Sequence, residues 1–372
     1  MRCRIKLKKR FLIPLCIIGL MIIVYAAAMF SRDFSDFYVG KIFPYISTPF
    51  VFLSGLLPFS LGEIMIIAAI VLVVVGVPLT LILLIFRKKS RKKTIGIFNA
   101  VFLWILAFIV TTETMNCFIM YRCTPFSDKY LSPKEHTSEE LAELYRILIT
   151  EANELAEVVP RDENGFFYLT CDVQEECKKA MKNISEDYPQ LKGYYPDAKP
   201  IINSFFMSQT STAGVFFPFS MESNYNDDML RVNLATTICH EFAHLKGIIQ
   251  EDEANFVSFL AATKSDNPEM RYAGYIMAIE YVDGDLWDYS PDLYEEVTED
   301  MSEYIFQDWF RFLPEKYWEE NESLEIIPTD TVETMSDAFT DTNIKLNGRE
   351  EGILSYGLVV ELLLDYYFPA KD

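Results

Sequence analysis

Two histidines four residues apart, with a glutamate directly after the first, form the pattern in this chain that is best suited to metal chemistry. His240, Glu241 and His244 follow the spacing His-Glu-x-x-His. Residues four apart share one face of an α-helix, so both imidazoles can bind one ion. Zn²⁺ suits imidazole and carboxylate ligands, and a catalytic site uses three protein ligands plus water. The pattern predicts His240 and His244 as zinc ligands and Glu241 as general base, then general acid, of a hydrolysis.

A third zinc ligand is predicted a few residues further along the chain. Gly247 can end the first helix in a left-handed conformation, and Glu251 would then begin a second helix. In such a hairpin Glu251 would lie near His244, and Asn255, one turn later, would lie near His240. We therefore expect Glu251 as the third ligand, Asn255 as the residue that orients a histidine, and Glu253 as the alternative ligand.

The same histidines would also suit a buried, hydrogen-bonded pair without a metal. The chain has only three histidines, and the two in the motif are flanked by Ile238, Phe242 and Leu245. These apolar neighbours predict a mostly buried helix, whereas histidines that serve solubility lie on an exposed face. We favour metal binding and keep the core pair as its alternative.

Three long apolar runs precede the motif. Each run can span a bilayer: residues 11–30, 64–86 and 95–112. Basic clusters at residues 2–10 and 87–93 flank these runs, and by the positive-inside rule both are cytoplasmic, so the third helix would end on the outer side. A cleaved signal peptide would have a shorter apolar core. Residues 31–62 suit an external loop or an interfacial segment.

The chain changes character after about residue 116. The net charge is −21, and the first 116 residues have about ten basic residues in excess, which leaves about −31 for the remainder. Residues 117–372 are long enough to bury a full core. Their acidity argues against nucleic acid as a partner. Two domains are predicted: a membrane domain at 1–116, with the lipid bilayer as partner, and an extracytoplasmic domain at 117–372.

The second domain is predicted to be mainly α (α+β), mostly helical with a small β-sheet or hairpin. Apolar periodicity and a capping box at Thr137 and Glu140 predict helices, here at residues 137–159, 174–184, 267–281, 292–312, 335–346 and 352–368. The stretch 201–218 holds the best strand candidates, and 220–228 is predicted as a polar turn.

Two further features bear on chemistry. A strand at Val215–Phe219 would offer an edge for an extended peptide, although an ordinary hairpin covering the core is an equal alternative. Tyr275 is a weak candidate for a donor to the oxyanion of peptide hydrolysis, with core packing as the favoured alternative.

Five cysteines follow the three apolar runs. Cys117 with Cys123 and Cys171 with Cys177 are two pairs at equal spacing, and they are predicted as disulfides, with free thiols as the alternative. Cys239 is expected to be a buried residue that points away from the metal ligands.

The order of motifs resembles a bacterial membrane-protein family catalogued as domain of unknown function 3810. The pieces that match it are Tyr121–Arg122, Gly214–Phe219, His240–Gly247, Glu251–Phe256, Arg271–Tyr275 and Ser355–Gly357. This resemblance implies a bacterial inner-membrane protein with three N-terminal helices, and the family has no settled activity.

A looser resemblance is to gluzincin peptidases. In these enzymes a His-Glu-x-x-His helix is followed by Glu-x-x-Ala/Ser-Asp, and here Glu251, Ala254 and Asn255 stand at the corresponding positions. The aspartate is replaced by Asn255, which can still accept a hydrogen bond from imidazole. The resemblance implies a zincin-like fold and a zinc metallopeptidase.

These observations predict a multi-pass protein of the bacterial cytoplasmic membrane, with a cytoplasmic N-terminus and an extracytoplasmic C-terminal domain. Its predicted function is zinc-dependent hydrolysis of envelope peptides or proteins. The alternative is a non-catalytic binding or sensor protein stabilised by metal. Hydrolysis of lipid or cell-wall amides would use the same residues, and the natural substrate is left open.

Overall fold

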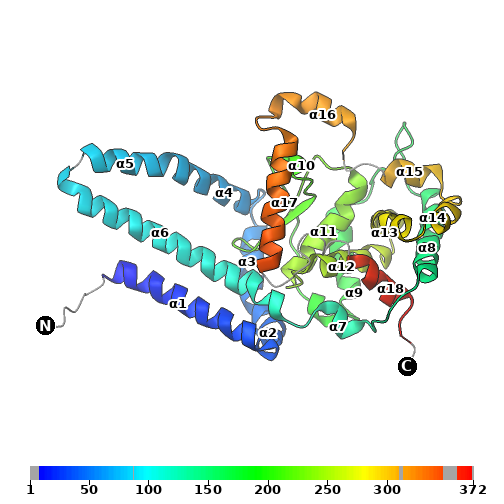
Figure 1. The fold of residues 1–372 in the computed structure, drawn as a ribbon, viewed down its shortest axis with the longest axis horizontal. Coiled ribbons are helices and arrows are strands. Elements are labelled where there is room, and N and C mark those ends of the chain that lie inside the picture. The colour runs from blue at the N-terminus through cyan, green and yellow to red at the C-terminus, as the bar shows by residue number, and fades with distance from the viewer. Residues whose placement is uncertain (1–7, 87, 310–312, 347–357, 371–372) are drawn as a thin grey trace. The chain divides into compact units, whose positions relative to one another are not determined.

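The computed structural model describes residues 8–86, 88–309, 313–346 and 358–370 (Figure 1). The described chain divides into two compact units: Met1–Cys123 with Phe217–Glu222, and Thr124–Phe216 with Ser223–Asp372. This grouping divides the chain between Cys123 and Thr124, and the predicted domain boundary between residues 116 and 117 stays a prediction. The predicted basic residues at 2–7, the predicted helix start at 352–357 and the matching piece Ser355–Gly357 lie outside the described residues.

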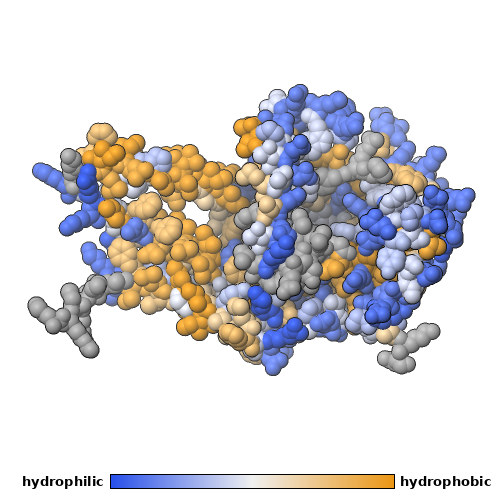
Figure 2. All heavy atoms as spheres, in the orientation of Figure 1, coloured by the Kyte–Doolittle hydropathy of each residue, from blue (hydrophilic) through white to orange (hydrophobic). Residues whose placement is uncertain are grey.

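The first unit contains the three predicted apolar helices. Three helical stretches are long and apolar enough to cross a membrane: Lys9–Phe30, Leu61–Phe86 and Arg91–Arg122. The elements within them are α1 (Lys9–Phe30), α4 (Leu61–Val71), α5 (Val77–Phe86) and α6 (Arg91–Glu113). Their side chains form the hydrophobic surface in Figure 2. The prediction of three such helices is confirmed, and the second and third extend beyond the predicted runs because polar residues continue their helical hydrogen bonding.

Residues 31–62 are mostly helical and do not form a loop. They contain α2 (Arg32–Phe37), the π-helical turn Tyr38–Ile42 and α3 (Phe43–Gly55). The hydroxyl of Tyr38 donates to the carbonyl of Met115 at 2.8 Å, which ties this segment to the end of the third long helix. The scattered charges and prolines suggested irregular backbone, but Pro44 lies in the first turn of α3, where a missing N–H costs nothing.

The second unit is mainly helical, as predicted. Its helices are α7 (Phe126–Tyr130), α8 (Ser138–Ala156), α9 (Val173–Ile184), α10 (Ser204–Gln209), α11 (Arg231–Leu245), α12 (Glu251–Thr263), α13 (Pro268–Tyr289), α14 (Pro291–Thr298), α15 (Glu303–Trp309), α16 (Glu315–Asn321), α17 (Thr329–Leu346) and α18 (Val359–Tyr367). The capping box at Thr137 and Glu140 starts α8 as predicted. Helices α11 and α12 form the buried centre, where Phe242, Phe256 and Phe259 are almost fully buried.

A small sheet lies before α11 in the chain. Within the described residues it has three strands, β1 (Lys199–Pro200), β2 (Gly214–Phe217) and β3 (Glu222–Tyr225), in the order β1-β3-β2. Strand β3 runs parallel to β1 with Lys199 opposite Asn224, and β2 is an edge strand. The sheet confirms the predicted fold class of mainly α with a small β component.

The prediction of strand candidates at 201–218 is confirmed for Gly214–Phe217, which forms β2, and is wrong for Ser204–Gln209, which forms α10. A short apolar run does not by itself distinguish a strand from a buried helix. A second local prediction is wrong. The predicted polar turn at 220–228 contains β3, whose polar side chains are buried. These side chains find partners inside the protein; Ser223, for example, donates to the carbonyl of Glu241 at 3.1 Å.

The six cysteines among the described residues form no disulfide. Neither predicted pair, Cys117 with Cys123 or Cys171 with Cys177, is joined within the described part of the chain. Cys123 donates to the Met120 carbonyl at 3.0 Å, and the thiol of Cys177 donates to a backbone carbonyl of α11 at 3.4 Å.

Candidate metal centre

The turn between α11 and α12 fixes the candidate site. Gly247 has φ of +82°, which glycine adopts without steric strain. Its N–H donates to the His244 carbonyl at 3.0 Å, and the N–H of Ile248 donates to the Ala243 carbonyl at 3.2 Å. This is a Schellman motif, and it ends α11 so that α12 begins at Glu251. The chain reversal follows from a single glycine.

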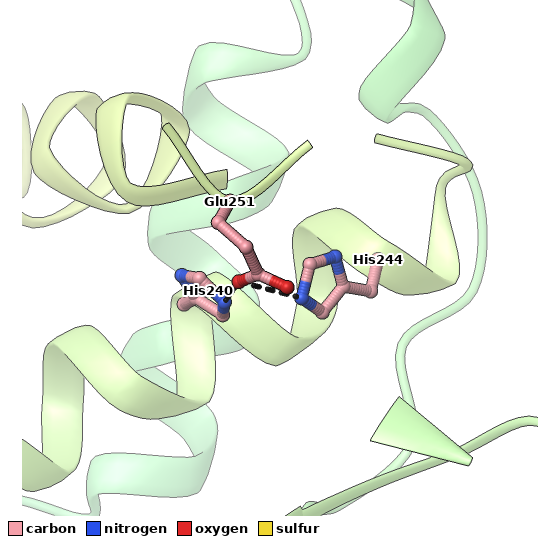
Figure 3. A group of neighbouring side chains, drawn as sticks. All are labelled: His240, His244 and Glu251. Carbon is pink, nitrogen blue, oxygen red and sulfur yellow. Dashed lines mark ion pairs between the residues drawn. The ribbon is translucent and has the colours of Figure 1, made fainter. Parts of the chain in front are cut away.

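Three predicted ligands converge across this turn (Figure 3). Nε2 of His240 is 3.1 Å from Oε2 of Glu251, and Nε2 of His244 is 3.7 Å from the same oxygen. The ligand atoms of the three residues all lie within 4.8 Å of one another, close enough to hold one metal ion. The centre is mostly shielded from solvent, since the three side chains are 7–19% exposed.

The other nitrogen of each histidine has an oxygen partner. Nδ1 of His240 lies 2.7 Å from Oδ1 of Asn255, and Nδ1 of His244 lies 2.7 Å from the carbonyl of Ile248. A carbonyl only accepts, so we assign the proton of each neutral ring to Nδ1. Both Nε2 atoms are then acceptors that face a carboxylate oxygen of Glu251. Three acceptors this close need positive charge between them, from a metal ion or a proton.

The electrostatics suit ligation by His244. Burial lowers its pKa to about 4, with Glu251 opposing and His240 adding to this effect. The ring is therefore neutral at pH 7, which is the form that binds a metal. Burial also lowers the pKa of His240, but the hydrogen bond and charge of Glu251 outweigh it, and the net pKa is raised. If a proton rather than a metal ion supplies the positive charge, it lies between His240 and Glu251.

Glu241 lies beside the two histidines and is 3% exposed. Its buried Oε2 has no hydrogen-bond partner among the described residues. Burial raises the pKa of Glu241 to about 8; His240 opposes this rise and Glu251 adds to it. A buried carboxylate oxygen without a donor is costly, and a nearby cation or a water would offset that cost. This observation is consistent with a metal ion held by His240, His244 and Glu251, with Glu241 beside it as a base.

The edge strand β2 passes directly over this base. A Cβ on Gly214 would collide with Oε1 of Glu241 and would lie 2.7 Å from Cγ2 of Thr237. The ring of Phe216 lies 5.9 Å from the ring of His244. Gly214 is a functional candidate that was named from the sequence only within a piece matching the family, since nothing in the pattern around it marks a close approach to α11.

The two remaining predicted candidates are Glu253, the alternative ligand, and Tyr275, the candidate donor to the oxyanion. Glu253 accepts hydrogen bonds from Ser127, from its N–H at 2.9 Å and its hydroxyl at 2.6 Å, and so does not join the ligand set. The ring of Tyr275 packs against Phe259, and burial raises its pKa to about 12, with the charge of Glu151 adding to the rise. These contacts agree with the alternative prediction that Tyr275 packs in the core.

Tyr281 is a tyrosine close enough to the candidate centre for the charge of Glu251 to affect its pKa. Burial raises its pKa, and the carboxylates of Glu280 and Glu251 raise it further, so its hydroxyl stays a proton donor. The helix periodicity around Tyr275 did not reveal this residue, because it depends on which turn of α13 lies near α12.

The fold and the site together define a class: three helices able to cross a membrane, joined to a mainly helical unit with a candidate metal centre. A family profile described as protein of unknown function (DUF3810) matches residues 38–364, and the chain belongs to this family. The comparisons with curated proteins and with solved structures gave no match. The activity must therefore be argued from the site itself.

Proposed function

We propose that the protein is a membrane-anchored zinc metallopeptidase. Two observations support this most directly. Three acceptor atoms face one another: Nε2 of His240, Nε2 of His244 and Oε2 of Glu251. Beside them, the buried Oε2 of Glu241 has no hydrogen-bond partner among the described residues. A purely structural site would fill every metal position with protein and would have no use for a second buried carboxylate that is not a ligand. The spacing of the motif and the likeness to gluzincins point to the same class.

Each residue then has a role. His240, His244 and Glu251 would hold the zinc, and Asn255 would orient His240 through its oxygen. A bound zinc ion supplies a Lewis acid that acidifies water and polarises the scissile carbonyl. Glu241 would take a proton from the attacking water and deliver it to the leaving amine.

The edge strand supplies a place for an extended substrate. In the part of the chain that the structure describes, β2 pairs with β3 and with no other strand, and Gly214 brings its backbone against Glu241. A peptide that adds to the free edge would gain backbone hydrogen bonds there. Phe216, beside His244, would contact a substrate side chain.

We place this site outside the cytoplasmic membrane. The basic residues at positions 8–10 and 88–93 would stay in the cytoplasm, so the third helix would deliver the second unit to the outer side. The substrate would then be an envelope peptide or protein. The acidity of residues 117–372 favours basic or neutral peptides over acidic ones.

The test uses the full-length protein purified in detergent, with Glu241→Gln beside wild type and exposed Glu319→Gln as the matched control. We expect about one zinc per chain in all three proteins. Cleavage of a peptide library should fall about 10²- to 10⁴-fold in Glu241→Gln and stay unchanged in Glu319→Gln, because only Glu241 moves the proton.

Other results separate the alternatives. If folded wild type binds no divalent metal, His240 and His244 are a buried, hydrogen-bonded pair of the core and the peptidase proposal is wrong. A wild type that binds zinc but cleaves neither peptides nor cell-wall or lipid amides, and that does not differ from Glu241→Gln, would favour the metal-stabilised binding protein.

A further inference from the structure

The strand next to the peptide-binding edge is polar, although its side chains are buried. Strand β3 lies between β1 and β2, and Ser223 in this strand and Asn226 directly after it are at most 1% exposed. Burial of a polar group costs free energy unless the group finds a partner, whereas a satisfied polar network fixes one arrangement of the segments that it joins. The segments joined here, within 204–216 and 223–241, all belong to the second unit.

Ser223 joins β3 to the helix of the candidate metal centre. Its hydroxyl donates to the carbonyl of Glu241 at 3.1 Å. Glu241 is the proposed base, so β3 contacts the backbone of the residue whose carboxylate would move the proton. This hydrogen bond fixes β3 against α11 at the level of the centre.

Asn226 joins the start of the edge strand to the end of β3. Its N–H donates to the carbonyl of Ala213 at 2.8 Å, and its Nδ2 donates to the carbonyl of Thr212 at 3.3 Å. Its Oδ1 accepts from the N–H of Asp228 at 3.0 Å, on the path to α11. Ala213 directly precedes Gly214, which approaches the base. The position of Gly214 therefore depends on Asn226.

Two further hydrogen bonds hold the same region. Nδ2 of Asn226 donates to Oγ of Ser208 in α10 at 3.0 Å, and Nδ2 of Asn224 donates to the carbonyl of Val215 at 3.2 Å. The edge strand is thus held on both sides of Gly214. A strand that is ordered before the substrate arrives does not have to be ordered on binding, which favours affinity.

We propose that β3 positions the peptide-binding edge over the base, with Asn226 as the positioning residue and Ser223 joining β3 to α11. Hydrogen bonds are directional, so polar contacts hold Gly214 in place more closely than apolar packing would. The inference rests on the proposed function for its effect on kinetics, whereas the ordering of β2 by Asn226 can be measured without it.

The test uses the full-length protein in detergent, with Asn226→Ala, Ser208→Ala and the matched control Asn153→Ala. Nδ2 of Asn153 donates to the carbonyl of Asp300 at 2.8 Å, and its Oδ1 accepts from the N–H of Ser302 at 3.0 Å. The control thus loses the same kinds of hydrogen bond, between α8 and the residues before α15. Ser208→Ala removes one partner of Asn226 and keeps the test valid if Asn226→Ala does not fold.

Three quantities are measured: bound zinc, kcat and KM for a peptide that the wild type cleaves, and hydrogen exchange of the backbone amides at 213–216. In Asn226→Ala we expect unchanged zinc and kcat, faster exchange, and a KM raised about tenfold, as for the loss of about one hydrogen bond. The effect falls on KM because a bound peptide orders the loosened strand again. Ser208→Ala should show smaller changes in the same direction, and Asn153→Ala should match wild type in all three.

The two hypotheses fail in different ways. If Asn226→Ala, or Ser208→Ala where the former does not fold, has the exchange and KM of Asn153→Ala, the positioning role is overturned. Loss of zinc in folded Asn226→Ala, or equally faster exchange throughout the second unit in all variants, would show a general structural role and would overturn it too. If the wild type cleaves no peptide, the proposed function fails, while the exchange at 213–216 still decides whether Asn226 orders the edge.

Discussion

Glu251 and Glu253 lie two residues apart in the first turn of the same helix, yet they face opposite kinds of partner. Glu251 meets the Nε2 atoms of two histidines, which are acceptors in the neutral rings. Glu253 meets two donors, the N–H and hydroxyl of Ser127. A carboxylate that faces donors stabilises the fold, and one that faces acceptors needs a cation.

The same division extends to other buried carboxylates. Glu269 accepts from the N–H of Thr170 at 2.6 Å, from its hydroxyl at 2.5 Å and from the N–H of Cys171 at 3.1 Å. Glu241, in contrast, has a buried oxygen with no donor among the described residues. Buried glutamate alone is therefore no sign of chemistry in this protein, and the partner of each oxygen distinguishes the two groups.

The largest expected effect comes from replacing Glu251 and Glu253 of α12 one at a time. Glu251→Gln should weaken zinc binding by more than the roughly 10- to 100-fold that loss of an outer partner costs, because it removes a ligand. Glu253→Gln should keep zinc and instead lower the free energy of unfolding by about 1.5–3 kcal/mol, because a charged acceptor of two hydrogen bonds is lost. Zinc titration and thermal unfolding of full-length protein measure both.

A reversed result would break the comparison. If Glu253→Gln lost zinc while Glu251→Gln kept it, the alternative ligand named from the sequence would be correct and the arrangement in Figure 3 would not be the binding one. His136→Ala is the control, since the two nitrogens of His136 already lie 3.3 and 2.8 Å from carboxylate oxygens of Glu140 and Asp365. We expect it to leave zinc binding unchanged.

The next effect concerns the space above the base. In Gly214→Ala the new methyl would meet Oε1 of Glu241 and Cγ2 of Thr237, so the strand or the carboxylate must move. A displacement of about 1 Å at a reacting group can cost about 100-fold in rate, and we expect a loss of that size with zinc retained. Peptide cleavage and zinc content are measured together.

Gly284→Ala is the matched glycine control, because a Cβ there meets nothing within 4 Å. Equal activity of Gly214→Ala and Gly284→Ala would mean that Glu241 does not act from its present position.

The convergence of His240, His244 and Glu251 and the turn between their helices could be predicted from the sequence, whereas the buried strand β3 could not. Spacing along a helix is local, so Gly247 and Glu251 could be assigned from neighbouring residues alone. The buried polar strand β3 was taken for a turn, since its partners lie far away in the sequence. The grouping of Phe217–Glu222 with the first unit depends on contacts more than 100 residues apart, such as that between Asn116 and Pro218.

A smaller effect is expected at the residue that orients His240. Asn255→Ala removes the acceptor of Nδ1 and should lower zinc affinity about 10- to 100-fold. Asn255→Asp should keep or raise affinity, because Nδ2 of Asn255 is buried without a partner and a carboxylate replaces it with an oxygen. Competition with a chelator measures the affinities. Lower affinity in Asn255→Asp than in Asn255→Ala would contradict the assigned proton on Nδ1.

The smallest effect is expected at Glu269, which belongs to the buried carboxylates that accept hydrogen bonds from donors. Burial alone would raise the pKa of Glu269, but the hydrogen bonds from Thr170 and Cys171 outweigh it and lower the pKa below its ordinary value of 4.5. A lowered pKa in the folded state stabilises the protein above pH 4.5, and this stabilisation is lost as the pH falls through the folded-state pKa. We expect Glu269→Gln to be less stable than wild type by about 1–2 kcal/mol at pH 7, with a difference that shrinks in acid. Thermal midpoints at pH 7, 5 and 3.5 measure it, with exposed Glu319→Gln as control, and a difference that grows as the pH falls would place Glu269 with the carboxylates that lack donors.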